Sequence, residues 1–498
     1  MSKMLIAYFS SSGETSRLAK TLAGVTGGDL FEIKPQAAYT AADLNWNASS
    51  SRSTLEMKDD KSRPAMAAPA DVAQYDVVFV GFPIWWYQAP RIIETFLESC
   101  DFSDKTLVPF ATSGGSGMGK TESILKACCA PTAKCLPGKR LSSRESAASV
   151  RNGWTVWGYE RRMTMEYTKL GKTDIEVSKL CVGCMSFGKA GTMHDWTLDE
   201  SATEAVVRHA LDLGINFFDT ANSYSAGTSE EYLGKALKKN VSRDKVVIAS
   251  KVYFNPGRLS REAIHREIDG SLKRLGTDYL DLYIIHRFDY ETPIEETMET
   301  LNDLVKAGKV RALGASAMYG YQFYNMQLCA RDHGWARFEA MENHYNLLYR
   351  EDERELIPIC RQMGVSLMPY SPLAAGHLTR PTWNADTLRS QTDRVAMGKY
   401  DRTEEQDMQI VARVHELAEK YGVKMQQIAL AWEWARGVAS PIVGATKTQY
   451  LDDAAGALAV RLTAEDVAYL EEPYLPHRIV GAIDRNPADG VVLLDEKK

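Results

Sequence analysis

The sequence predicts an α/β protein with two domains, an N-terminal doubly wound parallel sheet followed by a C-terminal (β/α)8 TIM barrel. Three observations support this prediction. The chain has 498 residues, which is too long for a domain with a single hydrophobic core. Apolar strand-like runs alternate with amphipathic helical runs, as in parallel sheets covered by helices. The alternation restarts near residues 161–164, so we expect one domain over residues 1–160 and a second over residues 165–498.

The composition is that of an ordinary globular protein. Hydrophobic residues make up 45% of the chain and charged residues 25%, which argues against long disordered regions. The formal net charge of −6 gives no electrostatic reason to expect nucleic acid or an anionic membrane as a partner. No apolar run reaches the roughly 18 residues that a membrane helix needs, and the first residues lack the features of a signal peptide. We expect a cytoplasmic protein without membrane association.

The eight cysteines lack histidine partners at metal-ligand spacing, so we predict no metal site. Cys181 and Cys184 form a C-x-x-C within the apolar run LCVGCMSFG. A redox C-x-x-C needs a helix N-terminus to stabilise its thiolate. We therefore interpret both residues as small, reduced core residues of a strand.

The first domain shows three pairs of strand and helix. The expected strands cover residues 4–9, 76–82 and 106–111, and the expected helices cover residues 15–23, 91–97 and, approximately, 121–129. An amphipathic stretch over residues 146–162 is expected to close the domain. Because a parallel sheet binds ligands at the carboxyl ends of its strands, the loops after these three strands form the first candidate site.

The second domain shows eight strand–helix units, which fit a closed barrel. The expected strands cover residues 179–184, 215–219, 246–251, 279–286, 310–316, 338–343, 365–370 and 441–445. Expected helices include residues 201–213, 230–239, 261–275 and 297–307. The segment 371–405 is long and polar, and a loop of that length is usually functional or disordered.

The three loops of the first candidate site have complementary chemistry. The first offers hydroxyl groups and a glycine before a helix N-terminus, which suits a phosphate. The second offers aromatic faces for a flat heterocycle, and the third offers exposed backbone N–H groups. Together they describe a pocket for flavin mononucleotide (FMN). The candidate FMN-binding residues are Ser10, Ser12, Gly13, Glu14, Thr15, Pro83, Trp85, Trp86, Tyr87, Thr112, Ser113, Gly114, Gly115 and Gly117.

At these loops the sequence resembles flavodoxin over roughly residues 1–160. Residues 10–15 match the family's S/T-x-T-G-x-T loop, and the similarity extends to ADLNW, FPIWW and FATSGGSG. The resemblance implies FMN binding and electron transfer. Residues 114–121 also fit the G-x-x-x-x-G-K-T pattern of nucleoside triphosphatases. Such an enzyme needs a second acidic strand end for magnesium, where this chain has Phe82 and Pro83, so we expect a flavin.

Polar residues end apolar runs in the second domain. Asp219 ends INFFD, Tyr224 follows in the same loop, Lys251 ends VVIASK and His286 ends YLDLYIIH. Catalytic groups of a barrel cluster where its strands end. A buried lysine and aspartate must pair to offset desolvation, and the lysine charge is expected to lower the pKa of Tyr224 towards neutrality. Tyr224 would then be a general acid, with His286 orienting a carbonyl oxygen.

These segments resemble the aldo-keto reductase family over about residues 165–480. FFDTANSY, IASK and DLYIIH match the segments of the family's catalytic tetrad. The resemblance implies that NADPH delivers a hydride to a small carbonyl substrate while Tyr224 protonates the oxygen. It also implies that Lys251 and Asp219 tune Tyr224 and that His286 positions the substrate.

The resemblance assigns further residues to the NADPH site. Tyr370 is expected to stack on the nicotinamide, Lys447 to bind the 2′-phosphate and Asp453 to lie near the adenosine. The expected NADPH-binding residues are Ser316, Glu342, Asn343, Tyr370, Ser371, Leu373, Gly444, Thr446, Lys447 and Asp453.

Two positions depart from the family pattern. Ala317 stands where asparagine is usual, and Glu342 stands where glutamine is usual. Both positions normally hold the nicotinamide carboxamide. An ionised glutamate accepts hydrogen bonds but cannot donate them, so we expect these departures to weaken cofactor binding.

We predict a natural fusion whose barrel reduces an aldehyde or ketone to an alcohol with NADPH, joined to an FMN-binding electron-transfer domain. One alternative is an NADPH-to-FMN electron-transfer protein that serves an external partner. Another is a redox-sensing regulatory or binding module, because some members of the barrel family act as regulatory subunits. Steady-state carbonyl reduction discriminates the first from the last, and anaerobic bleaching of FMN by NADPH identifies the second.

Overall fold

The computed structural model describes residues 3–145, 165–383, 392–393, 398–400 and 403–476. The chain divides into two compact units, Met1–Arg162 and Met163–Lys498. None of the helices in the described part of the chain has the length and apolarity that crossing a bilayer requires.

The first unit is built on a parallel sheet in the order β2-β1-β3-β4-β5, with β6 also paired to β4. The strands are β1 (Met4–Tyr8), β2 (Asp29–Glu32), β3 (Val77–Pro83), β4 (Thr106–Thr112), β5 (Lys134–Cys135) and β6 (Lys139–Arg140). The central strands are apolar along their length because helices cover both of their faces. The strand order reverses between β1 and β3, and doubly wound sheets bind ligands at that switch point.

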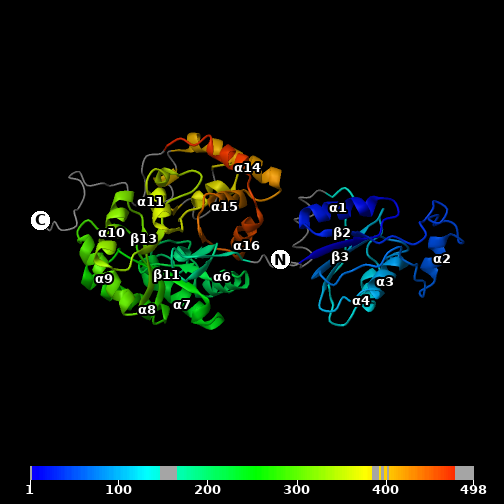
Figure 1. The fold of residues 1–498 in the computed structure, drawn as a ribbon, viewed down its shortest axis with the longest axis horizontal. Coiled ribbons are helices and arrows are strands. Elements are labelled where there is room, and N and C mark those ends of the chain that lie inside the picture. The colour runs from blue at the N-terminus through cyan, green and yellow to red at the C-terminus, as the bar shows by residue number, and fades with distance from the viewer. Residues whose placement is uncertain (1–2, 146–164, 384–391, 394–397, 401–402, 477–498) are drawn as a thin grey trace. The chain divides into compact units, whose positions relative to one another are not determined.

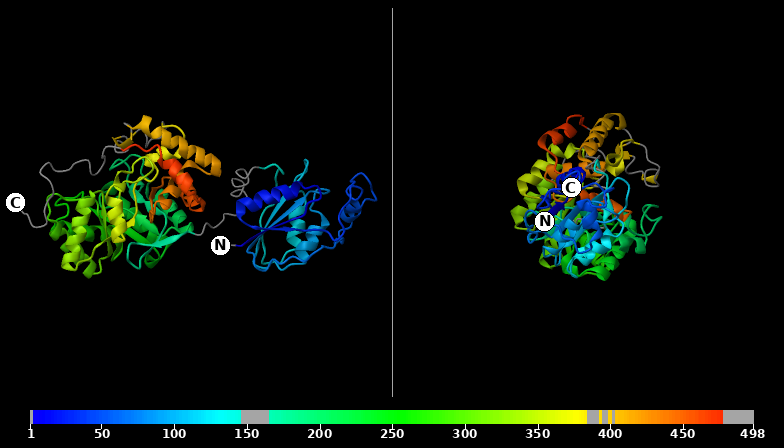
Figure 2. Two further views of the ribbon diagram at one scale, coloured as in Figure 1. Left: turned by 45° about the horizontal axis from the view of Figure 1, so that its top comes forward. Right: turned by 90° about the vertical axis from the view of Figure 1, so that its right-hand side faces the viewer.

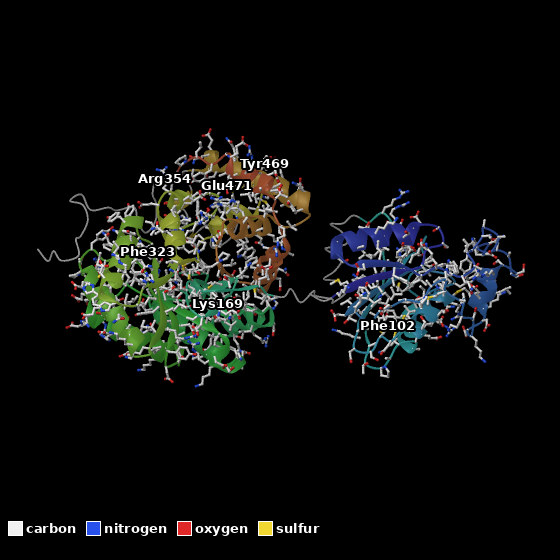
Figure 3. All side chains as sticks on the ribbon, in the orientation of Figure 1. Phe102, Lys169, Phe323, Arg354, Tyr469 and Glu471 are labelled. Carbon is white, nitrogen blue, oxygen red and sulfur yellow. The ribbon has the colours of Figure 1, made fainter. Side chains whose placement is uncertain are left out.

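Alternate residues of each strand face opposite sides of this sheet. Ile6 of β1 packs with Leu18 and Leu22 on one face, whereas Leu5 packs with Phe96 on the other. The helices are α1 (Glu14–Thr26), α2 (Arg52–Lys58), α3 (Arg91–Glu98) and α4 (Thr121–Ala127). Figure 1 shows α1 on one face of the sheet and α3 and α4 on the other. Phe102, labelled in Figure 3, packs against Phe96 with ring centroids 5.6 Å apart.

The second unit is an eight-stranded parallel barrel in the order β15-β14-β13-β12-β11-β10-β9-β16. Its strands are β9 (Cys181–Gly183), β10 (Phe217–Asp219), β11 (Val247–Val252), β12 (Leu280–Ile285), β13 (Val310–Ser316), β14 (Phe338–Glu342), β15 (Ser366–Leu367) and β16 (Ile442–Gly444). The barrel closes just after β15, where Tyr370 forms a parallel bridge with Ile442. There the Ile442 N–H donates to Pro369 O at 2.9 Å.

The side chains of the barrel strands separate into an inner and an outer set. Phe217 and Ala249 fill the interior, while their neighbours Phe218 and Ile248 pack against the surrounding helices. An antiparallel hairpin of β7 (Tyr167–Lys169) and β8 (Glu176–Ser178) adds Val177 to the interior cluster. The interior is therefore a packed core, with open chemistry only at its rim.

Helices surround this barrel (Figures 1 and 2). They are α6 (Glu200–Asp212), α7 (Thr228–Asn240), α8 (Arg261–Leu275), α9 (Ile294–Lys306), α10 (Gly320–His333), α11 (Leu356–Met363), α14 (Glu404–Tyr421), α15 (Met425–Ala435), α16 (Thr448–Gly456) and α17 (Ala464–Glu471). Capping residues explain where some of these helices begin or end. Asp199 accepts a hydrogen bond from Ala202 N at 2.8 Å at the start of α6. Gly276, with φ 67°, ends α8.

The predicted fold class is confirmed, with differences at individual elements. Several barrel strands are shorter than predicted, and Cys184 lies in the 3-10 turn η2 (Cys184–Ser186) instead of the strand, although both cysteines are buried as expected. The short elements β2, α2 and the β7–β8 hairpin were not predicted, because none carries a clear apolar period. The expected amphipathic stretch 146–162 lies outside the described residues.

Candidate active site

Every second residue of a barrel strand faces the interior, and these inward-facing side chains change from apolar to polar at the carboxyl ends of β10 and β11. Phe217 and Ala249 lie in the interior, and Asp219 and Lys251 follow two positions later at the carboxyl ends of β10 and β11. Both polar side chains are buried, Asp219 to 2% exposure and Lys251 to 0%. The fold therefore brings this acid–base pair together on the inner face of two neighbouring strands.

Tyr224 begins a tight turn after β10. It starts the 3-10 segment η3 (Tyr224–Gly227), in which Ser225 and Ala226 have φ of 48° and 55°. Non-glycine residues rarely adopt such angles, and they persist where the surrounding structure enforces them, often at functional sites. Tyr224 is only 8% exposed, so its hydroxyl lies in surroundings with little water.

Lys251 connects the polar groups of this cluster. Its Nζ donates to Asp219 Oδ1, to Thr220 O at 3.0 Å and to the Tyr224 hydroxyl at 3.4 Å. Burial alone would lower the pKa of Lys251, but the charge of Asp219, joined by that of Glu342 once it ionises, outweighs burial and raises this pKa well above the usual value. The lysine therefore stays charged, and its pairing with Asp219 follows the expectation for a buried cation.

The pKa of Tyr224 is raised, so the prediction that it falls towards neutrality is wrong. Burial disfavours the phenolate, and this effect exceeds the opposing charge of Lys251. The negative charges of Glu342 and Asp219 raise the pKa further. Tyr224 is consequently protonated at physiological pH, and Lys251 acts only on the phenolate that remains once a proton has left.

His286 lies next to Tyr224 at the end of β12. It is two residues beyond the inward-facing Ile284, and its ring meets the Tyr224 ring edge-on, with centroids 5.8 Å apart and an interplanar angle of 78°. Burial and the charges of Lys251 and Arg287 hold the pKa of His286 well below its usual value. The imidazole is therefore neutral, and a neutral imidazole can donate one hydrogen bond to a carbonyl oxygen.

Glu342 extends the buried cluster from β14. It follows the interior residue Ala340 by two positions, is 3% exposed, and places Oε2 3.3 Å from Lys251 Nζ. Burial and then the charge of Asp219 raise the pKa of Glu342 to about 8. The expectation of an ionised Glu342 is therefore wrong near neutral pH, where the carboxyl is mostly protonated and can donate a hydrogen bond.

Ser316 on the neighbouring strand holds the Glu342 backbone, and Asn343, the next residue in the chain, presents a further polar atom. Ser316 Oγ donates to Glu342 O at 2.8 Å. Asn343 Nδ2 donates to Asp352 Oδ2 at 3.0 Å, and burial raises the pKa of Asp352 to about 7. Asn343 Oδ1 is buried and accepts no hydrogen bond from the described residues. A buried acceptor without a donor is costly, so this oxygen is suited to meet a ligand.

The loops after β13 and β15 have strained backbones. Ala317 and Ser371 have φ of 47° and 56°, and Ser371 is followed by the half-buried Leu373. Tyr370 stacks on His344 with ring centroids 5.3 Å apart. Such angles cost on the order of 1–3 kcal/mol each and tend to occur at functional sites.

The end of β16 combines an open backbone with polar side chains. Nothing lies within 4 Å of the position that a Cβ on Gly444 would take, so the backbone there is open to approach. Thr446 is half-buried, and the exposed Lys447 is the N-cap residue of α16. Asp453 is paired with Lys424, Nζ to Oδ1 2.7 Å. A cation, a hydroxyl and the first amides of a helix are donors that suit a phosphate.

In the first unit, the hydroxyl-rich loop wraps the N-terminus of α1. Ser10 Oγ accepts hydrogen bonds from Gly13 N at 3.1 Å and Ser16 N at 3.2 Å. Gly13 has φ 84°, which a side chain would oppose. Thr15 Oγ1 lies 2.8 Å from Thr112 Oγ1. This contact joins the first loop to the carboxyl end of β4.

The aromatic loop after β3 touches both ends of the glycine loop after β4. Ile84 N donates to Thr112 O at 3.0 Å, and Tyr87 contacts the residues just beyond Gly117. Trp86 and Tyr87 have φ of 46° and 63° and are 41% and 69% exposed. Lys120 N donates to Tyr87 O at 3.2 Å. A Cβ on Gly119 would lie 2.0 Å from that same oxygen. The predicted serine, aromatic and glycine loops therefore lie together at one edge of the sheet.

Two aromatic residues near these sites were missed by the sequence analysis. Phe254 is 50% exposed and its ring centroid lies 5.0 Å from that of His286. Tyr39 packs 5.4 Å from Trp85. The signal for Phe254 was its place three residues after Lys251 in the loop that follows β11. Tyr39 had no such signal, because β2, the strand that comes before it, was not predicted.

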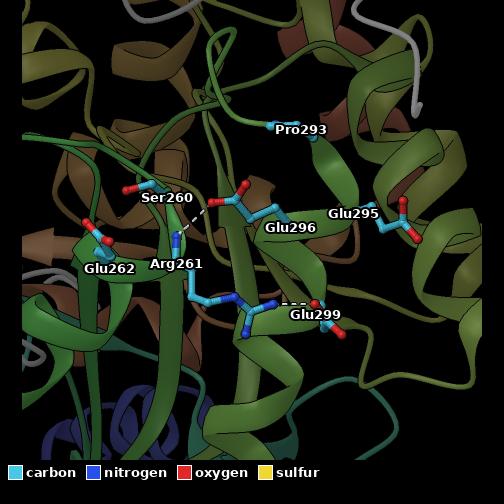
Figure 4. Close-up of a pocket in the computed structure, with 7 residues that line it drawn as sticks. All are labelled: Ser260, Arg261, Glu262, Pro293, Glu295, Glu296 and Glu299. Carbon is cyan, nitrogen blue, oxygen red and sulfur yellow. Dashed lines mark hydrogen bonds and ion pairs between the residues drawn. The ribbon is translucent and has the colours of Figure 1, made fainter. Parts of the chain in front are cut away.

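A cavity of about 670 Å³ lies away from this cluster, at the starts of α8 and α9 (Figure 4). Four glutamates and Arg261 line it, and Arg261 pairs with Glu299 while its backbone N–H donates to Glu296 Oε1 at 3.1 Å. None of the four tetrad residues lines this cavity, so we assign it no part in the reaction.

Each of the two units matches a different known protein family. The aldo/keto reductase family model matches residues 179–474, more than half of the chain, and the flavodoxin model matches residues 3–156. The chain belongs to the aldo/keto reductase family. The barrel of this aldo/keto reductase is an NADP-dependent oxidoreductase, and the chain joins it to a flavodoxin domain as a fusion.

The matches to several curated relatives extend over almost the full length of each relative. A versiconal hemiacetal acetate reductase of Aspergillus parasiticus is 43% identical over 340 residues, covering 63% of this chain and 98% of the relative. A putative aryl-alcohol dehydrogenase of Schizosaccharomyces pombe is 44% identical over 350 residues, covering 64% and 98%. Another, of Saccharomyces cerevisiae, is 39% identical over 340 residues, covering 63% and 98%.

Proposed function

We propose that the barrel reduces an aldehyde or ketone to an alcohol, with NADPH as the reductant and Tyr224 as the proton donor. The observation that carries this proposal is the convergence of a tyrosine, a lysine, an aspartate and a histidine at the carboxyl ends of neighbouring barrel strands. Packing alone does not require a buried cation beside a buried phenol, because both groups are costly to desolvate. Their juxtaposition supports proton transfer.

The proposed roles follow from the protonation state of each group. Neutral His286 donates a hydrogen bond to the carbonyl oxygen and orients it. Tyr224 then donates its proton to that oxygen. The charge of Lys251, 3.4 Å away, stabilises the phenolate that remains. Asp219 keeps Lys251 charged and in place. NADPH, when bound, supplies the hydride.

The residues present fit NADPH. The buried Asn343 Oδ1 lacks a donor among the described residues, as expected of a group that meets a ligand amide. The open backbone at Gly444 allows close approach. Thr446 and Lys447, with the amides of α16, are the proposed partners of the 2′-phosphate. The exposed Phe254 beside His286 offers an apolar wall for substrate, so aromatic aldehydes come first in the test panel.

We further propose that residues 1–160 bind FMN and transfer electrons, to the barrel's cofactor or to an external partner. The contact between Thr15 and Thr112 and the hydrogen bond from Ile84 N to Thr112 O support this proposal, because they join the three candidate loops at the end of β4. The glycine loop is open, since nothing lies within 4 Å of a Cβ built on Gly114 or Gly115. A helix N-terminus, aromatic faces and free amides are the donor set that a flavin phosphate and ring require.

Tyr224→Phe tests the proposed reduction. We expect turnover with aromatic aldehydes, followed by NADPH oxidation, to fall by about 10²-fold or more, while NADPH and FMN remain bound. Tyr283→Phe is the control, because its hydroxyl is also buried. Unlike that of Tyr224, it has no hydrogen-bond partner among the described residues, and it lies in the core outside the barrel interior. Near-wild-type turnover of Tyr224→Phe would remove this mechanism.

A further inference from the structure

Two buried carboxyl groups surround the one lysine of the proposed active site. Lys251 Nζ contacts Asp219 Oδ1 and lies 3.3 Å from Glu342 Oε2. The lysine side chain is 0% exposed and each carboxyl side chain 3%. Glu342 on β14 supplies the second carboxyl, and Asp219 on β10 supplies the first. A single cation therefore faces two acidic groups in a site that excludes water.

Two buried carboxyl groups that face one cation favour a state in which one of them keeps its proton. Asp219 Oδ2 and Glu342 Oε2 are buried, and neither accepts a hydrogen bond from an N–H or O–H of the described residues. Both carboxyl groups nevertheless lie against Lys251 Nζ, and the charge of Asp219 raises the pKa of Glu342. Two carboxylates repel, and they bond only when one of them keeps its proton.

The other groups that face Glu342 do not supply a second positive charge. Besides Asp219 on β10 and Lys251 on β11, they are the Tyr224 phenol of η3 and the Cys181 thiol of β9. Burial raises the pKa of both the phenol and the thiol, so both are neutral at physiological pH. Lys251 balances one negative charge, and ionisation of Glu342 leaves the cluster with an unbalanced one.

We propose that Glu342 is a positioning residue that shares one proton with Asp219 and thereby sets the net charge beside the Tyr224 hydroxyl. This inference rests on the proposed carbonyl reduction. With the proton in place, the cluster of Asp219, Lys251 and Glu342 is neutral overall, and the phenolate formed by donation is opposed by no excess charge. When Glu342 ionises, the added negative charge disfavours that phenolate, and reduction slows.

The first experiment compares pH profiles of kcat/KM for aldehyde reduction, because such profiles report groups of the free enzyme. In the wild-type chain, we expect kcat/KM to fall about tenfold between pH 7 and pH 9, the loss of the protonated fraction of a carboxyl whose pKa is about 8. Glu342→Gln keeps the shape of the side chain but cannot ionise, so its profile should be flat over this interval. The same tenfold fall in both proteins would overturn the proposal.

Glu433→Gln is the matched control. Glu433 on α15 is also fully buried, burial raises its pKa well above the usual value, and neither carboxyl oxygen has a hydrogen-bond partner among the described residues. It lies outside the Lys251 cluster. This variant should keep the wild-type fall between pH 7 and pH 9, and a flat profile here would show that any buried carboxyl produces the effect, which contradicts the proposal.

A second measurement does not depend on turnover. The infrared band of a protonated carboxylic acid at Glu342, identified as the part missing from Glu342→Gln, should disappear with the same midpoint as kcat/KM. Asp219→Asn removes the neighbouring charge that raises the pKa of Glu342, so the midpoint should move to lower pH. An unchanged midpoint excludes a shared proton. If Tyr224→Phe proves fully active, the proposed function fails, but this titration still decides whether the proton is shared.

Discussion

At the residue scale, burial has opposite consequences for the charges of Tyr224 and Lys251. The phenol stays protonated because nothing nearby outweighs the loss of water. The lysine stays charged because two carboxyl groups replace that water. An acid that holds its proton and a cation that stabilises the resulting phenolate form a usable pair even though the pKa of Tyr224 is high. The positioned charge of Lys251 then favours proton donation by Tyr224, the role that a lowered pKa was expected to play.

Lys447→Ala is predicted to reduce the preference for NADPH over NADH. A positioned ammonium makes a charge-assisted hydrogen bond to the 2′-phosphate, worth roughly 1.5–3 kcal/mol, and about 1.4 kcal/mol is tenfold in affinity. We therefore expect the Kd for NADPH to rise at least about tenfold, with little change for NADH. Titration of cofactor fluorescence measures both constants.

Lys273→Ala, in the last turn of α8, serves as the control, since that lysine lies on a helix outside the proposed site. It should leave both constants unchanged. Equal weakening of NADH and NADPH binding by Lys447→Ala would mean that the phosphate site lies elsewhere.

The sequence predicted which residues gather at the barrel rim because position along a strand determines the direction of a side chain. Asp219 and Lys251 could be placed on one face by counting from apolar neighbours. The same count places Glu342 on the inner face of β14, but its contact with Lys251 depends on side-chain reach across the barrel. The sign of the Tyr224 pKa shift could not be predicted either, because it depends on how completely water is excluded.

At the element scale, the backbone of the aromatic loop in the flavodoxin domain contacts the backbone just beyond the glycine loop. Gly119 has φ 54°, and a Cβ there would lie 2.0 Å from the Tyr87 carbonyl oxygen. Gly119→Ala must therefore displace one of the two loops. Strain at such an angle costs about 1–3 kcal/mol, and we expect FMN affinity, measured by quenching of flavin fluorescence, to fall about tenfold or more.

Gly24→Ala is the comparison for this prediction. Gly24 lies in α1 with nothing within 4 Å of its Cβ position, and alanine favours a helix over glycine. FMN affinity should be unaffected. A normal affinity in Gly119→Ala as well would show that the contact with Tyr87 does not position the flavin loops.

Long apolar elements could be predicted, whereas short polar ones could not. β3 and β4 are buried on both faces and read as continuous apolar runs. β2 is half polar and largely exposed, so only its pairing with β1 identifies it as a strand. The hairpin of β7 and β8 could not be predicted either. It packs against the barrel interior, and no local sequence pattern indicates this contact.

At the scale of the whole molecule, each unit has its own hydrophobic core. The clusters around Phe96 and Phe79 lie within the first unit, and those around Phe218 and Phe217 lie within the second. We therefore expect residues 1–160 to fold alone and to bind one FMN per domain, measured by the absorbance spectrum of the purified fragment. A folded fragment that stays colourless after addition of FMN would contradict the flavin site.

Lys120→Ala in the same fragment checks the alternative nucleoside triphosphate site. Lys120 is exposed and lies beyond the glycine loop, so flavin binding should persist. ATP hydrolysis by the fragment that is lost in this variant would favour the triphosphatase instead.

Two buried carboxyls of the barrel also take up protons when it folds. The pKa of Glu342 is raised from 4.5 to about 8 and that of Asp352 from 3.8 to about 7. Each folded carboxyl therefore keeps a proton that the unfolded chain releases. Their contribution to stability is complete below about pH 4. It falls by about 1.4 kcal/mol per pH unit for each proton above that pH, and it is gone once pH has passed 7 to 8.

Thermal unfolding of the barrel near pH 6 should accordingly release up to two protons from these groups. Calorimetry in buffers of different ionisation enthalpy counts them, because the released protons add the buffer's own heat to the transition. Glu342→Gln should lower the count by about one, and the variant should gain stability over the wild-type chain as the solution becomes more alkaline.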